Sequence, residues 1–316
     1  MFKLLANDGI DPIGKEILEK AGFTVDTQTV PQEQLAEALQ NYDALTVRSA
    51  TKVRKELINS CPNLKLIGRG GVGMDNIDVD YARNKGIAVV NTPAASSLSV
   101  AELVFAHLFT GVRFLQDANR AMPSKGATAF NDLKKAYAKG IELRGKTIGI
   151  IGFGRIGRET AKIALGLGMD VLAYDFSPIP ETLPVVFSGG IEVNLPVKGV
   201  TFETLLAESD FISLHVPFTD KPIIGAAEFA QMKNGAALVN CSRGGTVDET
   251  ALLAALDSGK LAFAGLDVFD NEPTPHQDLL SHSKISLSPH IGASTNEAQE
   301  RIGTELAQLI IDHFKH

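Results

Sequence analysis

The spacing of hydrophobic positions divides the chain into two series of short apolar runs separated by helical stretches. In residues 1–90 the runs predicted to be strands are "KLLAN", "TVDTQTV", "DALTVRS", "LKLIGRG" and "IAVVNTP", with amphipathic "IGKEILEKAG" and "QEQLAEALQNY" among the stretches between them. From Lys146 a second series follows: "KTIGIIGFG", "MDVLAYD", "DFISLHVP", "GAALVNCSRG", "LAFAGLDVF" and "KISLSPH". Strands of a parallel sheet read as continuous apolar runs because helices cover both faces. The pattern therefore predicts an α/β protein with two doubly wound parallel sheets.

Two further helices follow from capping patterns. Ser99 and Glu102 form a capping box before a buried apolar pattern, which predicts one helix from Ser99 to Ala121, about 34 Å long. Ser294 and Glu297 repeat the capping pattern after the last strand. One helix is too little for a third domain, so we expect it to pack on the first. This predicts a discontinuous domain of residues 1–97 and 289–316, with residues 98–288 inserted.

Composition narrows the functional class. With 316 residues the chain exceeds the ~250–300 residues of a single core. Its net charge of −7 disfavours nucleic-acid binding. Cys61 and Cys241 lie in no metal-ligand spacing, which favours a reducing cytosol and no disulfide or metal site. We find no N-terminal signal and no apolar run of ~20 residues, so the sequence predicts a cytosolic protein without a membrane partner.

The motif Gly-x-Gly-x-x-Gly occurs at Gly68–Gly73 and at Gly152–Gly157. The second copy follows an apolar strand and opens a helix, and the next strand ends in Asp175, about 20 residues on. Gly152 permits the tight turn, Gly154 lets the backbone approach a pyrophosphate, and Gly157 allows close packing of helix and strand. Asp175 would bind ribose hydroxyls and repel a 2′-phosphate, so NAD is predicted rather than NADP.

The first copy lacks this context. Its next strand ends in Asn91, with no acid. We interpret Gly68–Gly73 as a strand-to-helix loop that does not bind a dinucleotide.

Three strand ends of the second series carry groups suited to hydride chemistry on a hydroxy acid. "VNCSRGGTVDE", "LDVFDNEP" and "SPHIGAST" offer Arg243, Glu272 and His290. An arginine binds a carboxylate bidentately, and a histidine exchanges protons near neutral pH. A carboxylate beside the imidazole would favour the imidazolium. Spacing alone does not choose His290 over His215, which lies at a strand end in "ISLHVP".

Together, "GFGRIG…YD", "NCSRGGTVDETAL", "LDVFDNEP" and "SPHIGAST" resemble the D-2-hydroxyacid dehydrogenase family, and "VRSATKV", "GRGGVGMDNIDVDYARNKGIAVVNTP" and "HIGASTNEAQ" its D-3-phosphoglycerate dehydrogenase branch. The resemblance covers nearly the whole chain. It implies a Rossmann NAD-binding domain inserted in a flavodoxin-like substrate domain, and a homodimer formed through the NAD-binding domain. It also implies Arg243 as substrate anchor, His290 as acid/base and Glu272 as its partner. The implied cofactor-binding residues are Val72, Gly152, Gly154, Arg155, Ile156, Gly157, Asp175, Val216, Pro217, Thr219, Cys241, Asp267 and Ala293.

The first domain carries the candidate substrate residues. Arg48 and Arg69 end two strands, and Ser49, Gly71 and Asn91 lie at the same strand tips. Two guanidiniums in an acidic chain favour a substrate with a carboxylate and a phosphate. With the resemblance, this predicts oxidation of D-3-phosphoglycerate to 3-phosphohydroxypyruvate, the first step of serine biosynthesis. The alternatives are another D-2-hydroxyacid dehydrogenase, of glycerate, hydroxypyruvate or lactate type, and a non-enzymatic NAD-sensing corepressor-like protein.

The chain departs from the family pattern in four places. It has no Trp, whereas family members commonly carry Trp and a basic residue before "ELRGKT"; Lys134 and Lys135 are candidates for the basic residue. Pro222 stands where Thr is frequent, and "VVFSGGIEVNLPVKGVTFETL" is longer than usual. The chain ends at His316 without the regulatory domain of longer relatives, so we expect no serine feedback through such a domain.

Overall fold

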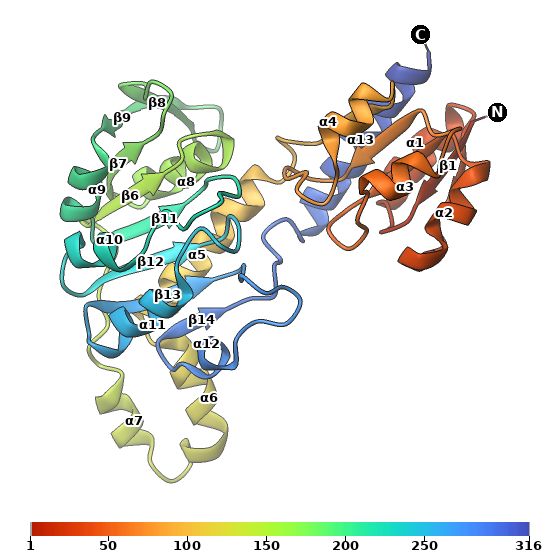
Figure 1. Ribbon diagram of the computed structural model, residues 1–316. Coiled ribbons are helices and arrows are strands. Elements are labelled where there is room, and N and C mark those ends of the chain that lie inside the picture. The colour runs from red at the N-terminus through yellow and green to blue at the C-terminus, as the bar shows by residue number, and fades with distance from the viewer. Residues whose placement is uncertain (1, 316) are drawn as a thin grey trace. The chain divides into compact units, whose positions relative to one another are not determined.

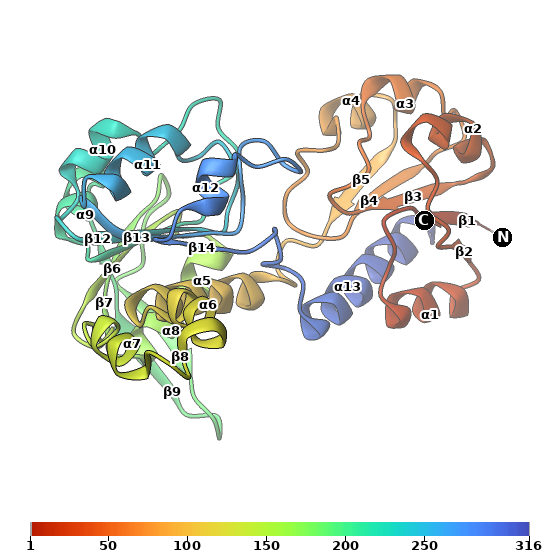
Figure 2. The ribbon, with the colours of Figure 1, turned by 90° about the horizontal axis from the view of Figure 1, so that it is seen from below.

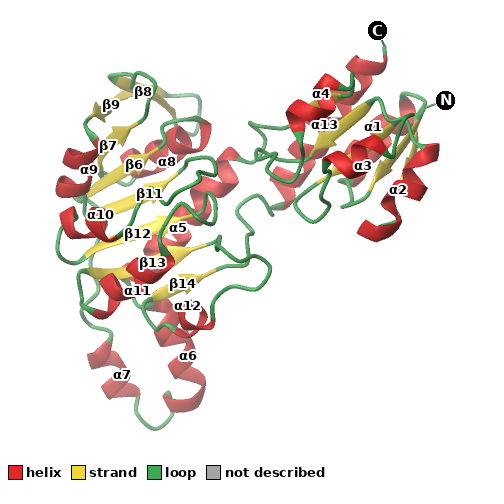
Figure 3. Cartoon of the chain, viewed as in Figure 1, coloured by secondary structure: helices red, strands yellow, loops and turns green. Residues whose placement is uncertain are grey.

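The computed structural model describes residues 2–315. The chain divides into two compact units (Figure 1): unit 1 comprises Met1–Ser99 and Ala293–His316, and unit 2 comprises Val100–Gly292. Each unit is an α/β fold built on one parallel sheet, as the alternation of apolar runs and helices predicts. Figure 3 shows the strands and helices of each unit.

Unit 1 has a five-stranded parallel sheet in the flavodoxin-like order β2-β1-β3-β4-β5. The strands are β1 (Lys3–Ala6), β2 (Thr24–Asp26), β3 (Ala44–Val47), β4 (Leu66–Arg69) and β5 (Ala88–Asn91). The helices are α1 (Pro12–Lys20), α2 (Leu35–Ala38, flanked by 3-10 turns Gln32–Gln34 and Leu39–Asn41), α3 (Lys55–Asn59), α4 (Val79–Asn84) and α13 (Asn296–Phe314). Helices α1 and α13 cover one face of this sheet, and α2, α3 and α4 lie on the other (Figure 2).

Unit 2 has a seven-stranded parallel sheet in the order β10-β7-β6-β11-β12-β13-β14. The strands are β6 (Thr147–Ile151), β7 (Asp170–Tyr174), β10 (Lys198–Gly199), β11 (Phe211–Leu214), β12 (Ala236–Asn240), β13 (Leu261–Leu266) and β14 (Ile285–Leu287). The helices are α5 (Ser97–Val112, which begins in unit 1), α6 (Leu115–Lys125), α7 (Phe130–Ala136), α8 (Arg155–Gly166), α9 (Phe202–Glu208), α10 (Ala226–Gln231), α11 (Glu249–Asp257) and α12 (Gln277–Ser281).

Two hydrophobic cores hold unit 2 together, one on each face of the sheet. Successive side chains of a strand point to opposite faces, so Ile150 belongs to the core under α5 and α8, while Ile151 belongs to the core under α9 and α11. Figure 2 shows α5 and α8 on one side of the sheet and α10 and α11 on the other. Both faces of β6 are therefore apolar, and helices on each side of the sheet shield them from water.

The predicted helix from Ser99 to Ala121 is not one helix. It starts at Ser97 and stops at Val112, and α6 begins at Leu115 after a bend of 57°. Phe114 has a left-handed φ of 55° between the two helices, and Gly111 is the penultimate residue of the first one. The predicted cap at Ser99 is wrong for the same segment, because Ser99 lies inside α5.

The cap of the last helix is also displaced by one residue from the prediction. Helix α13 begins at Asn296, and Thr295, not Ser294, is its N-cap; the Thr295 hydroxyl accepts from the N–H of Ala298. Both residues are typical caps. Local sequence does not distinguish them because either hydroxyl could reach a free N–H.

The long stretch after β7 forms an antiparallel hairpin of β8 (Thr182–Val186) and β9 (Glu192–Pro196). Leu183 and Val185 are buried, and the hairpin packs on α8. Its tip exposes Phe187 and Ile191.

In the described chain, no single helix is long and apolar enough to cross a membrane; α5 and α6 pass that test only as a bent pair.

Candidate active site

His290 and Glu272 form a hydrogen-bonded pair at the carboxyl ends of β14 and β13. Nδ1 of His290 lies 2.7 Å from Oε2 of Glu272, while Oε1 of Glu272 accepts from the N–H of Phe269 at 3.0 Å. A carboxylate only accepts, so Nδ1 carries the proton and Nε2 of the neutral ring has a free lone pair. The side chains are 42% and 35% exposed, which leaves the imidazole within reach of a small molecule.

The electrostatic environment keeps Glu272 ionised. Burial alone would raise the pKa of Glu272, but the hydrogen bond and charge of His290, the Phe269 N–H and the nearby Arg243 guanidinium together lower this pKa below its ordinary value. An ionised carboxylate beside Nδ1 stabilises an imidazolium. The pair is therefore suited to accepting a proton at Nε2.

Arg243 belongs to a loop after β12, and the buried side chain of Asn240 holds this loop in place through hydrogen bonds. The Asn240 amide donates to the Arg243 carbonyl at 3.0 Å and accepts from the N–H of Ser242 at 3.0 Å. This loop packs directly on the Glu272 loop: a Cβ on Gly244 would lie 2.0 Å from the Phe269 carbonyl oxygen. The close contact holds Arg243 and Glu272 on neighbouring strand ends.

The backbone around His290 is fixed by Asp267. The N–H of His290 donates to the Asp267 carbonyl, and the N–H groups of Ile291 and Gly292 donate to the Asp267 carboxylate, each at 2.8 Å. His290 adopts a left-handed φ of 54°, unusual for a residue other than Gly. Such conformations persist where surrounding contacts over-determine them.

The glycine loop after β6 is built to admit a pyrophosphate. Gly152 has a φ of 91°, and a Cβ there would lie 2.5 Å from the His215 carbonyl oxygen. A Cβ on Gly157 would meet the Gly152 carbonyl at 2.2 Å, whereas one on Gly154 would meet no atom within 4 Å. The first and third glycines are therefore required by packing, and the second leaves open space at the N-terminus of α8.

Within unit 2, the residues predicted to bind NAD lie in this loop and at the carboxyl ends of the neighbouring strands. Arg155 and Ile156 open α8, and Asp175 follows β7, with its carboxylate accepting from Phe153 and Ser177 N–H groups at 2.6 and 2.8 Å. Val216, Pro217 and Thr219 follow β11, Cys241 follows β12 and Asp267 follows β13. Val72 and Ala293 belong to unit 1. The unit 2 members of this set gather at the carboxyl edge of its sheet, where doubly wound folds bind nucleotides.

His215, the competing histidine, lies in a different environment. Burial lowers the pKa of His215 to about 3. The Thr160 hydroxyl donates to the Ile156 carbonyl, so it accepts from Nε2–H of His215 at 3.1 Å. Nδ1 is buried and has no hydrogen-bond partner among residues 2–315. A neutral, enclosed imidazole is a poor proton carrier near neutral pH.

The predicted substrate residues of unit 1 lie at the carboxyl ends of β3, β4 and β5. Arg48 follows β3, is half-buried and has no side-chain hydrogen bond or ion pair within residues 2–315; it lines a cavity of about 500 Å³ with Asp8 and Gly70. Ser49 is exposed beside it. The Arg69 guanidinium bonds to the Gly70 carbonyl at 2.9 Å and lies over Gly71. The Asn91 amide donates to the Val72 carbonyl at 2.7 Å, so it also supports the loop after β4.

Sequence reasoning missed one buried group. His107 of α5 bonds to Ser286 and Ser288 of the β14 segment, and Ser288 bonds to Asp267. The available signal was a polar residue among the buried positions of α5 from Val100 onward, which are otherwise apolar. Lys134 and Lys135, candidates for the basic residue of the family, lie in the last turn of α7. In the described part of the chain, no group of three or more His, Cys, Asp or Glu could hold a metal.

Comparison with known proteins identifies the family. Residues 105–292 match the model of the D-isomer specific 2-hydroxyacid dehydrogenase NAD-binding domain. A hydroxypyruvate reductase of Thermotoga maritima is 44% identical over 98% of this chain and 97% of its own length. A D-3-phosphoglycerate dehydrogenase of Methanocaldococcus jannaschii is 42% identical over 98% of this chain, which spans 57% of that relative's length.

Solved structures agree. The D-lactate dehydrogenase of Aquifex aeolicus, complexed with NAD and lactic acid, has a TM-score of 0.79 at 30% identity and covers 99% of this chain and 95% of its own. A glyoxylate reductase of Paecilomyes thermophila has a TM-score of 0.82 at 31% identity, over 99% and 94% of the two chains. The glycine cradle and Asp175 fit NAD, the cofactor of this family. The chain therefore belongs to the NAD-dependent D-isomer-specific 2-hydroxyacid dehydrogenases.

Proposed function

We propose that this dehydrogenase oxidises D-3-phosphoglycerate to 3-phosphohydroxypyruvate, the first step of serine biosynthesis, and catalyses the reverse reduction. The half-buried guanidinium of Arg48 carries this proposal, because it lines a cavity without a hydrogen bond or ion pair in residues 2–315. A guanidinium that lines a cavity without an ion pair of its own favours an anionic ligand group, although Asp8, Asp11 and Glu300 line the same cavity. The substrate phosphate would supply that group.

The proposed chemistry follows from the site of unit 2. Nε2 of neutral His290 accepts the proton of the C2 hydroxyl, and Glu272 stabilises the imidazolium that results. Arg243 binds the substrate carboxylate as a two-pronged donor. NAD held by the glycine loop and Asp175 would supply the acceptor for the hydride that leaves C2. In the reverse direction His290 returns its proton to the carbonyl oxygen, so the residues switch roles but not positions.

A second candidate substrate pair is glycerate and hydroxypyruvate. The Thermotoga maritima hydroxypyruvate reductase aligns with this chain over nearly its whole length, whereas the phosphoglycerate dehydrogenase of Methanocaldococcus jannaschii is much longer. Under this alternative Arg48 binds no phosphate.

A substrate panel separates the two. We expect NADH absorbance to fall fastest, at equal low concentration, with 3-phosphohydroxypyruvate, against hydroxypyruvate, pyruvate and 2-oxoglutarate. A higher kcat/KM for hydroxypyruvate would favour the second candidate. Tight NADH binding without turnover of any 2-oxo acid would instead indicate an NAD-sensing corepressor-like role.

An arginine substitution tests the role of the cation directly. Arg48→Ala should raise KM for 3-phosphohydroxypyruvate about 10- to 100-fold, the effect of losing a charged hydrogen bond, with a much smaller change for hydroxypyruvate. Arg54→Ala is the matched control, because Arg54 belongs to the same unit but pairs with Asp78 at 3.0 Å. Equal losses on both substrates would contradict a phosphate role.

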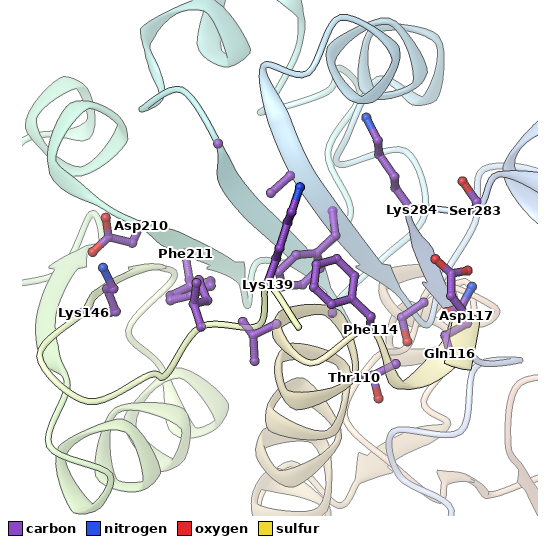
Figure 4. Close-up of a pocket in the computed structure, with 17 residues that line it drawn as sticks. Thr110, Phe114, Gln116, Asp117, Lys139, Lys146, Asp210, Phe211, Ser283 and Lys284 are labelled. Carbon is purple, nitrogen blue, oxygen red and sulfur yellow. The ribbon is translucent and has the colours of Figure 1, made fainter. Parts of the chain in front are cut away.

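We also propose that the protein is a homodimer formed through unit 2. A cavity of about 580 Å³ lies at the amino ends of its strands, next to α5 and α6, and Phe114, Phe211 and Ile141 line it (Figure 4). Leu115 and Phe130, on α6 and α7, are more than half exposed. Apolar patches on a protein surface are typical of association sites, and in this proposal Leu115 and Phe130 belong to such a patch.

Light scattering tests the dimer. Phe130→Asp should shift the mass towards the monomer, whereas Ile191→Asp, which charges the exposed β8–β9 tip, should not. A monomeric wild-type protein would contradict the proposal.

Both cysteines are free and buried, in keeping with the reducing cytoplasm that we propose as its compartment.

A further inference from the structure

A directed chain of hydrogen bonds connects helix α5 with the loop that carries His290. Nδ1 of His107 lies 2.8 Å from the Ser286 hydroxyl, and Nε2 lies 3.0 Å from the Ser288 hydroxyl. Ser288 in turn donates to Oδ1 of Asp267 at 2.6 Å. The three side chains are 3%, 9% and 9% exposed, in the order His107, Ser286 and Ser288, so water does not replace these bonds.

The donors and acceptors in this chain are fixed by the chemistry of its ends. The Asp267 carboxylate accepts, so the single Ser288 proton points to it. Ser288 must then accept from Nε2–H of His107. Burial lowers the pKa of His107 although Asp267 opposes it, so the imidazole is neutral and its Nδ1 accepts from the Ser286 hydroxyl.

The fold makes specific room for this imidazole. Gly265 of β13 faces it, and a Cβ there would lie 2.6 Å from the Cβ of His107. Any other residue at position 265 would push α5 away from the sheet at this point. The close approach brings the ring within reach of two serines far away in the sequence.

We propose that His107 is a positioning residue, which acts through Ser288 and Asp267 to hold the His290 loop in its reactive conformation. Asp267 bonds the N–H groups of His290, Ile291 and Gly292, and its carboxylate keeps its orientation by accepting from Ser288. The left-handed φ of His290 needs such support, because an L-residue leaves that region when its contacts loosen. His107 itself touches neither substrate nor cofactor in this proposal.

This inference rests on the proposed role of His290, and the variants separate the two. His107→Leu and Ser288→Ala each interrupt this series of hydrogen bonds. Each variant should lower kcat about tenfold, the equivalent of one hydrogen bond. The KD for NADH should change less than kcat does, because the glycine loop is untouched, although Ser288 bonds to Asp267, a predicted cofactor-binding residue. His107→Gln retains a donor at the position of Nε2 and should recover most of the lost kcat.

Two controls exclude a merely structural effect. Leu108→Ala removes a buried side chain next to His107 on α5. It should lower Tm at least as much as His107→Leu does, yet preserve kcat per NADH-binding site. Ser286→Ala cuts the far end of the chain and should reduce kcat less than Ser288→Ala. We would determine kcat per site from NADH fluorescence titration of each purified variant.

The outcomes are decisive in both directions. Full kcat in Ser288→Ala and His107→Leu would overturn the proposal, as would an equal loss in Leu108→Ala or no recovery in His107→Gln. If His107→Leu does not fold, Ser288→Ala and Ser286→Ala alone decide by the order of their losses. His290→Asn is assayed alongside: activity in that variant would refute the proposed function itself, whereas its inactivity with full activity in Ser288→Ala would refute only the positioning role.

Discussion

The carboxylate of Asp175 accepts a 2.6 Å hydrogen bond from the backbone N–H of Phe153, inside the glycine loop. The acid predicted to bind the NAD ribose therefore also ties the end of β7 to the turn after β6. Its charge and its acceptor atoms have separate roles, which two substitutions can distinguish.

Asp175→Asn keeps an acceptor for Phe153 but removes the negative charge. We expect it to retain activity with NAD and to gain activity with NADP, because a 2′-phosphate is no longer repelled. Asp175→Ala removes both roles and should also weaken NAD binding. The ratio of kcat/KM with the two coenzymes checks this; an unchanged ratio in Asp175→Asn would contradict the assignment of the charge.

The glycine loop separates cofactor binding from folding. Gly154→Ala places a methyl in open space, so Tm should hold while the KD for NADH rises. Gly157→Ala places it 2.2 Å from the Gly152 carbonyl oxygen, so that variant should lose stability as well. Thermal melts and NADH titrations would measure both. A Gly154→Ala protein that binds NADH normally would argue against a pyrophosphate at this loop.

Glu272→Gln preserves the size of the side chain but removes its charge. Because the pKa of Glu272 is lowered in the folded protein, the carboxylate is ionised near neutral pH and stabilises the imidazolium of His290. Losing a charged hydrogen bond of this kind should reduce kcat about 10- to 100-fold. Steady-state kinetics with Asp270→Asn, on the same loop, as control would test it; equal losses in the two variants would deny Glu272 a specific role.

His215 should make the protein less stable in acid. Burial holds its pKa at about 3, whereas an unfolded histidine titrates near ~6.5. Between these values the unfolded chain binds a proton that the folded chain does not. Lowering the pH through this window therefore reduces the free energy of unfolding by about 1.4 kcal/mol per pH unit, and above it the contribution is constant.

The substitution His215→Gln should flatten this dependence. We expect urea unfolding of the variant to show a smaller loss of stability than wild type between about pH 6 and pH 4. His276→Gln, at an exposed position, should leave the slope unchanged. Identical slopes in His215→Gln and wild type would show that His215 is not neutral in the folded state at these pH values.

The periodicity of apolar residues predicted the two parallel sheets because each buried strand appears as a continuous run, as in "TIGII" of β6. It did not predict the break after Val112, because Gly111 inside an apolar helical pattern costs only about 1 kcal/mol of helix propensity and does not by itself mark an end. The left-handed φ of Phe114 marks that break in the structure, and local propensity does not report it. Local propensity likewise does not report the choice of Thr295 over Ser294 as a cap.

The sequence predicted the cofactor loop of the candidate site on physical grounds, but it did not by itself identify the catalytic histidine. The spacing of the glycines and Asp175 carries its own physical rationale, so the cofactor loop followed from the residues themselves. Selecting His290 over His215 needed the family resemblance, and the difference becomes physical only in the structure, where His290 is paired with Glu272 and His215 is enclosed. The bond from His107 to Ser288 spans 181 positions, and no local pattern indicates it.

The most direct test of the account is turnover of a His290→Asn variant whose NADH binding has been measured. Asparagine tolerates the left-handed φ of position 290 better than most residues, so the loop should persist without the imidazole. We predict a KD for NADH near that of wild type and a kcat about 10²- to 10⁴-fold lower, the usual contribution of a general acid or base. A kcat within a few-fold of wild type, at normal NADH affinity, would contradict the central claim that His290 exchanges the substrate proton.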